Sequence, residues 1–160
     1  MDQMEEFQWL DSAEQHAWRQ YLRATATLTE ALNHDLIEEA GISLNEYEVL
    51  SRLSETTGHT LRMSTLAEGL VHSRSRLTHT VRRLEGEGLV ARSAAEDDRR
   101  GVNCSLTEKG YKFLADIAPI HVQSVRNHIV DKLGHEKMLQ FGKLCELLGE
   151  DNSGDSEENE

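Results

Sequence analysis

The sequence contains one proline and three phenylalanines among 160 residues, which argues against an all-β or proline-rich architecture. No apolar stretch approaches the ~18 residues that a membrane span requires. Two cysteines, Cys104 and Cys145, are too few for a disulfide framework. The start of the chain is acidic where a secretory signal would be basic. We therefore expect a mainly helical, cytoplasmic protein that has no contact with a membrane.

Positive charge is also scarce, because 29 acidic and 17 basic residues leave a net charge of −12. This average would exclude a nucleic-acid binder, but it hides a gradient along the chain. Residues 59–103 hold eight arginines and six acids, and residues 69–84 hold four arginines and no acid. Polyanion binding depends on the local field, and arginine suits forked contacts with phosphate and guanine. This stretch is therefore the candidate DNA surface.

The first half of the chain reads as helices with clear boundaries. Apolar residues at three- and four-residue steps predict a long helix over residues 14–39, which Gly41 ends. The capping box Ser43-Leu44-Asn45-Glu46 predicts the start of a second helix. Residues 59–62 are predicted to form one short strand, and Ser64 is expected to cap a brief helix.

The pattern changes after the next helix, which Ser73 caps and which runs to residue 87. Residues 89–92 and 102–106 read as strands around a charged turn, and Val102, Cys104 and Leu106 are expected to face inward. A long helix follows from Thr107 and is expected to kink at Pro119, and a last helix covers residues 136–148.

This order predicts a mainly α protein with a small β wing: a winged helix-turn-helix with N- and C-terminal dimerisation helices. We assign residues 41–107 to the DNA-binding region, residues 1–40 and 108–149 to the helical dimerisation region, and residues 150–160 to an acidic disordered tail. The terminal helices carry broad apolar stripes that must pack on something, and a second copy of the chain is the expected partner.

The helix over residues 73–87 has two contrasting faces. At 100° per residue, Leu77, Val81 and Leu84 fall on one side, and hydroxyls, a histidine and arginines fall on the other. A recognition helix needs this arrangement, whereas a merely solvated face is the alternative. The candidate DNA contacts on this helix are Ser73, Arg74, Ser75, Arg76, Thr78, His79, Arg82 and Arg83.

The charged turn supplies the remaining candidates. Arg99 and Arg100 are adjacent at a tight turn and could enter a minor groove. The neighbouring Asp97 and Asp98 are expected to orient an arginine of the wing or of the helix before it. A simple polar turn is the alternative.

Three segments together resemble the MarR family of bacterial transcription regulators: residues 73–90, Asp97-Asp98-Arg99-Arg100-Gly101, and Leu106-Thr107-Glu108-Lys109-Gly110. The resemblance implies a homodimer on a palindromic double-stranded operator, with helix 73–87 in the major groove and the wing in the minor groove. Asp98 matches the family's wing aspartate and Arg100 its groove-inserting arginine. The resemblance also implies a repressor that a small aromatic or amphipathic ligand releases.

A pocket for such a ligand is expected where the first, second and fifth helices meet. Its candidate wall residues are Trp18, Tyr21 and Tyr47, and the candidates to meet an anionic group are Arg19, Arg52 and His34. For Trp18 and Tyr21 the first interpretation is dimer or core packing, and lining the pocket is the alternative.

Other functions rest on weaker patterns. Both cysteines read as core residues, with a thiol sensor as the alternative, and His121, His128 and His135 recur every seven residues, which leaves a metal sensor open. A winged-helix protein–protein adaptor is the alternative from another class. No catalytic triad or carboxylate pair suggests an enzyme, and we expect no cofactor.

Overall fold

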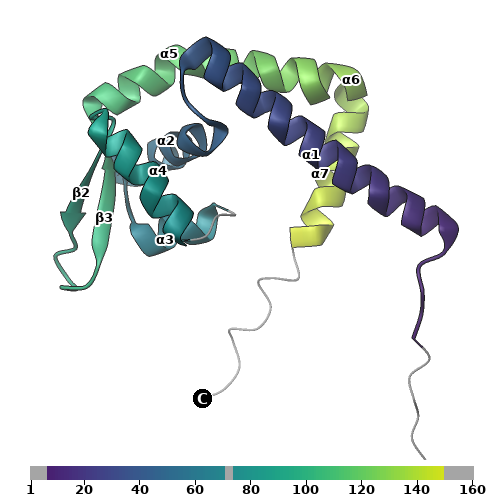
Figure 1. Ribbon diagram of the computed structural model, residues 1–160, viewed down its shortest axis with the longest axis horizontal. Coiled ribbons are helices and arrows are strands. Elements are labelled where there is room, and N and C mark those ends of the chain that lie inside the picture. Colours follow the sequence, from purple (N-terminus) through teal and green to yellow (C-terminus); the bar gives the residue numbers. More distant parts are fainter. Residues whose placement is uncertain (1–6, 71–73, 150–160) are drawn as a thin grey trace, which may run out of the picture.

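The computed structural model describes residues 7–70 and 74–149, which form an extended helical arm and a compact lobe (Figure 1). The arm consists of α1 (Ser12–Ala40), α5 (Glu108–Val125), α6 (Asp131–Leu133) and α7 (His135–Gly149). The lobe consists of α2 (Leu44–Glu55), β1 (Thr60–Arg62), α3 (Met63–Gly69), α4 (Arg74–Gly86), β2 (Val90–Ala94) and β3 (Val102–Leu106). The predicted mainly α fold with a small wing is confirmed.

The helix boundaries follow from local chemistry. Gly41 ends α1 with a left-handed φ of 72°, as its lack of a Cβ permits. The predicted capping box starts α2, because Ser43 and Glu46 each accept a hydrogen bond from the other's backbone N–H. The prediction for Ser64 is wrong: the N-cap of α3 lies two residues earlier, at Arg62, which makes no side-chain capping bond. Ser73 lies outside the described residues.

The three strands form an antiparallel sheet in the order β1-β3-β2. The predicted bridging strand is β1, which pairs Leu61 with Cys104 at the centre of β3. Of the three β3 residues expected to face inward, Cys104 is fully buried and Leu106 is half-buried. Val102 is 41% exposed because it pairs with Ala94 at the outer end of the wing, beyond the core.

The hydrophobic core lies inside the lobe and also fastens the arm to it. Leu36 at the end of α1 and Leu114 and Ile117 of α5 belong to the same cluster as the lobe residues. The buried lobe members include Val49, Leu50, Leu53, Leu66, Leu77, Val81, Leu84, Val90 and Cys104. The lobe is thus held by the C-terminal end of α1 and the first half of α5, while the rest of the arm extends away (Figure 1).

The junction between the lobe and α5 is closely packed at Gly110. A Cβ at this position would lie 2.0 Å from the Leu89 carbonyl oxygen and 2.8 Å from Leu106 Cδ1. Gly110→Ala is therefore expected to lower the free energy of unfolding by about 3 kcal/mol, because backbone cannot move aside as a side chain can. Urea unfolding measures this change.

The matched control is Gly86→Ala, at the end of α4, where an added Cβ meets nothing within 4 Å. It should leave stability unchanged or raise it by up to ~1 kcal/mol, because alanine favours a helix over glycine. Equal unfolding midpoints for the two variants would contradict the close packing of Gly110.

The arm departs from regular helix later than expected. α5 runs through Pro119 to Val125, and the irregular part is a π-helical turn over Arg126–Val130. At this turn Asp35 of α1 accepts hydrogen bonds from the Ser124 hydroxyl at 2.6 Å and from His128 Nε2 at 2.9 Å. These bonds hold the pKa of Asp35 below its usual value and fasten α1 to the end of α5.

The α7 helix carries apolar side chains that nothing in the described chain buries. Leu144, Leu147 and Leu148 are 60, 63 and 72% exposed, and α1 adds Trp18 and Leu22 at 52 and 47%. The prediction that Cys145 is a core residue is wrong for the single chain, because it shares this exposed helix. None of the described helices is long and apolar enough to cross a membrane.

Candidate nucleic-acid interface

The two faces predicted for α4 are present. Leu77, Val81 and Leu84 are buried against the lobe. The exposed candidates are Arg74, Ser75, Arg76, His79, Arg82 and Arg83. Thr78 is half-buried and donates a hydrogen bond to the Arg74 carbonyl at 2.9 Å. The result is a cationic ridge on a helix whose opposite side is fixed in the core.

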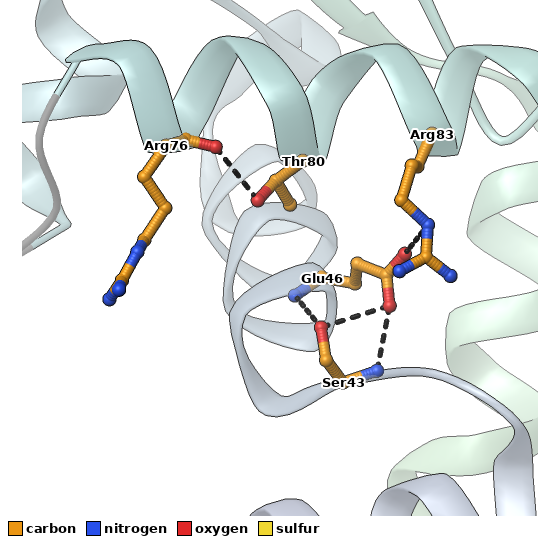
Figure 2. A network of polar contacts seen from close by, with 5 residues as sticks. All are labelled: Ser43, Glu46, Arg76, Thr80 and Arg83. Atoms are coloured by element: carbon orange, nitrogen blue, oxygen red, sulfur yellow. Dashed lines mark hydrogen bonds and ion pairs between the residues drawn. The ribbon is translucent and has the colours of Figure 1, made fainter.

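A polar network joins α4 to the start of α2 (Figure 2). Arg83 Nε lies 3.5 Å from Glu46 Oε1, and the other carboxylate oxygen accepts from the Ser43 N–H at 2.7 Å and the Ser43 hydroxyl at 2.9 Å. Nearby, the buried Thr80 donates its hydroxyl to the Arg76 carbonyl at 3.0 Å. The sequence indicates Glu46 only as a helix cap, and no local pattern indicates its contact with α4.

The wing presents Arg99 and Arg100 on an exposed turn, as predicted. The turn closes when the Gly101 N–H donates to the Asp98 carbonyl at 2.9 Å. The Asp98 carboxylate accepts from the Arg100 N–H, also at 2.9 Å. Asp98 therefore shapes the backbone that carries Arg100.

The wing aspartates hold an arginine that the sequence does not indicate as a candidate. Arg62 Nη2 lies 2.5 Å from Asp97 Oδ1, and Arg62 Nη1 lies 3.6 Å from Asp98 Oδ2. Arg62 ends β1, so the side-chain partner of Asp97 lies outside the wing and the preceding helix, where it was expected. Asp98, in contrast, does orient a wing arginine through the Arg100 N–H. The hydrogen bond from Arg62 keeps the pKa of Asp97 below its usual value. Only the pairing of β1 with β3 brings these residues together.

A second ion pair connects the wing to α4. Arg92 of β2 donates from Nε at 3.1 Å and Nη2 at 2.8 Å to Glu85, which also accepts from the Arg92 N–H at 3.1 Å. These bonds lower the pKa of Glu85 and raise that of Arg92. Strand β2 is thus fastened to α4, and Arg92 serves the lobe's structure.

Two clefts lie on either side of α2. One of about 820 Å³ separates α1 from α4, and its wall includes Tyr21, Arg76 and His79. The other, of about 400 Å³, lies where α1, α2 and α5 meet, and Tyr47 and Arg52 line it as predicted.

The remaining ligand candidates lie elsewhere. Trp18 and Arg19 are exposed on α1 and line neither cleft, and the same is true of His34. Trp18 stacks on Tyr21, with ring centroids 5.6 Å apart. The structure therefore divides the predicted pocket residues between two clefts and the surface of α1.

The smaller cleft is lined by His121, one of the three histidines whose seven-residue spacing leaves a metal site open. His121 packs on Tyr47 with ring centroids 4.2 Å apart, and its buried Nδ1 has no hydrogen-bond partner. Burial lowers its pKa. His128 instead bonds Asp35, and His135 is exposed at the start of α7. Within residues 7–70 and 74–149 no three metal-ligating side chains come together.

Cys104 is expected to be chemically inert in the folded protein. It has no exposed surface, and burial raises the pKa of its thiol to about 11. At pH 8 only about one thiol in 1,000 would then be ionised, and thiolate is the reactive form. Iodoacetamide followed by mass spectrometry should modify Cys104 in urea and leave it intact without urea. Rapid modification of the native protein would favour the thiol-sensor alternative.

Comparison with known proteins agrees with this geometry. The model of the MarR family matches residues 42–102, which span the lobe from the start of α2 into β3. The AbsC regulator of Streptomyces coelicolor is 40% identical, with 93% of this chain and 100% of that chain covered and a TM-score of 0.82. Sco3205 of the same organism, solved in complex with DNA, is 36% identical, with 94% of both chains covered and a TM-score of 0.87.

A curated relative matches over a shorter segment. The transcriptional repressor MprA of Escherichia coli K12 is 31% identical over 84 residues, which make up 52% of this chain and 48% of MprA. The chain thus matches about half the length of this relative.

Proposed function

This chain belongs to the MarR family of transcriptional regulators, and from that premise we propose that it is a dimeric, sequence-specific DNA-binding repressor released by a small ligand. The α4 ridge and the exposed wing turn carry the proposal, because together they match what major and minor grooves require. The ion pair of Arg92 with Glu85 holds the wing to α4, and the ion pair of Arg62 with Asp97 holds the wing turn to β1. A rigid pair of this kind can contact two grooves without a further ordering cost.

Counterion release tests DNA binding directly. Shift assays on DNA fragments from around its own gene, at several salt concentrations, should give a log–log slope of roughly −5 to −9, because ~6–10 neutralised phosphates release their counterions. The double variant Arg99→Ala/Arg100→Ala should give a shallower slope, because two candidate groove contacts are lost per protomer. A wild-type slope near zero would reject DNA binding.

A second copy of the chain is the proposed partner of the arm. The exposed apolar side chains of α1 and α7 are more than the surface of a monomeric protein usually carries. Two-fold pairing would bury both sets. A symmetric dimer presents two lobes, so we propose that the operator is palindromic.

We place the effector in the 400 Å³ cleft between α1, α2 and α5. An aromatic ligand there would pack on the Tyr47 and His121 rings that line the cleft. The cleft also reaches the end of α3: Leu70 lines it, and the Arg52 guanidinium lies against Gly69. A ligand that displaces either residue would shift the end of α3.

Ligand titration tests this placement. Phenols and phenolic acids should release the protein from its operator. Tyr47→Leu should weaken that release by at least ~5-fold, since one lost aromatic contact amounts to ~1 kcal/mol or more. DNA affinity without ligand should stay within about twofold. Tyr21→Leu, in the larger cleft, is the matched control. If Tyr21→Leu impairs release and Tyr47→Leu does not, the effector binds in the larger cleft.

A further inference from the structure

Glu46 occupies an unusual position for a helix-capping residue. Its side chain is 6% exposed, yet it forms an ion pair with Arg83, whose side chain is 62% exposed. The carboxylate is held from below by the Ser43 N–H and hydroxyl, and it faces the recognition helix through its second oxygen (Figure 2). A buried charge is costly, so a contact between it and a surface arginine calls for an explanation.

The contact leaves most of the guanidinium available. An arginine has five N–H donors in a rigid fork, and the pair with Glu46 is made through Nε. The two Nη groups together can still donate to a phosphate in bidentate fashion. The contact with Glu46 restricts the rotamers of Arg83 before DNA binds. Arg83 therefore loses less side-chain entropy on binding than a flexible arginine would.

The position of Arg83 along α4 indicates which part of DNA it meets. Base edges are contacted by the first turns of a recognition helix. Arg83 lies in the last turn of α4, beside the start of α2. A contact at that end of the helix fits the backbone that borders the groove.

We propose that Glu46 is a positioning residue for DNA binding: it holds Arg83 through Nε so that both Nη groups meet one backbone phosphate in each half-site. The inference rests on the proposed function and adds a residue that does not itself touch DNA. The residue that caps α2 thus also contributes to the affinity of α4 for DNA.

Glutamine at position 46 separates the capping role from the positioning role. Its single carbonyl oxygen can accept from the Ser43 N–H and hydroxyl as Glu46 does. Its NH₂ group then faces Arg83 and opposes the Nε–H donor. Glu46→Gln therefore keeps the cap and removes the hold on Arg83.

A double-mutant cycle on the full-length protein tests the proposal, with operator affinity measured by fluorescence anisotropy. Glu46→Gln should weaken binding by about 3- to 10-fold when Arg83 is present and by less than twofold in an Arg83→Ala background. Arg83→Ala should also reduce the salt slope by about 2 per dimer, one phosphate in each half-site. Glu39→Gln, which removes an exposed carboxylate at the end of α1, should change affinity by less than twofold.

Arg83→Lys provides a second measurement that leaves Glu46 intact. Lysine keeps the charge but has no fork, so it should lose nearly as much affinity as alanine. Equal effects of Glu46→Gln with and without Arg83, tighter binding by Glu46→Gln, or full function of Arg83→Lys would overturn the proposal. A wild-type protein without salt-dependent operator binding would reject both this inference and the proposed function, whereas normal binding without coupling would reject the inference alone.

Discussion

Replacing Leu144 by aspartate is expected to turn the protein into a monomer and to weaken operator binding by about 100- to 10,000-fold. Leu144 is 60% exposed on α7, and Phe141 and Leu148 lie within 60° of it around the helix. In a two-fold interface each such substitution occurs twice, so the lost burial and the buried carboxylates are both doubled. Each half-site then binds a separate monomer. Binding at one half-site therefore no longer raises the effective concentration of protein at the other.

Sedimentation and anisotropy together measure this effect. Sedimentation gives the oligomeric state at micromolar concentration, and anisotropy gives operator affinity. Lys143→Gln is the matched control, because it makes the same change of one charge unit at an exposed position 100° around α7. It should remain dimeric. A Leu144→Asp protein that is still a dimer would show that the α7 face is not the interface.

The features that the sequence predicted correctly are those that neighbouring residues determine. The buried stripe of α4 follows from the helical period of Leu77, Val81 and Leu84. The Ser43–Glu46 capping box and the Gly41 helix end each depend on a few consecutive residues. Local chemistry of this kind is readable without knowing what the segment packs against.

The features that the sequence missed are contacts between distant elements. Arg62 and Asp97 are 35 residues apart and meet only because β1 pairs with β3. The contact of Glu46 with Arg83 depends likewise on how α2 packs on α4. Cys145 was misassigned for a different reason: an apolar stripe predicts burial, but it does not say whether the covering surface belongs to the same chain.

The two cationic elements are expected to contribute differently to operator choice. Arg76→Ala should cost about 1–3 kcal/mol at the cognate site, or roughly 5- to 150-fold in affinity, and relax the preference at one base pair in each half-site. Arg76 is exposed in the first turn of α4, where base edges are within reach. Arg100→Ala should weaken all sites more evenly and remove a preference for A·T-rich flanks, because the minor groove distinguishes mainly A·T from G·C.

Affinities for the cognate operator and for single-base variants of it, at fixed salt, separate these roles. Arg76→Lys is the informative control, because it keeps the charge and loses the fork that pairs with guanine. It should therefore bind a scrambled sequence as the wild-type protein does and discriminate poorly between operators. If Arg76→Ala instead weakens cognate and scrambled sites equally, Arg76 contacts phosphate, and base recognition must be assigned to other residues on the exposed face of α4.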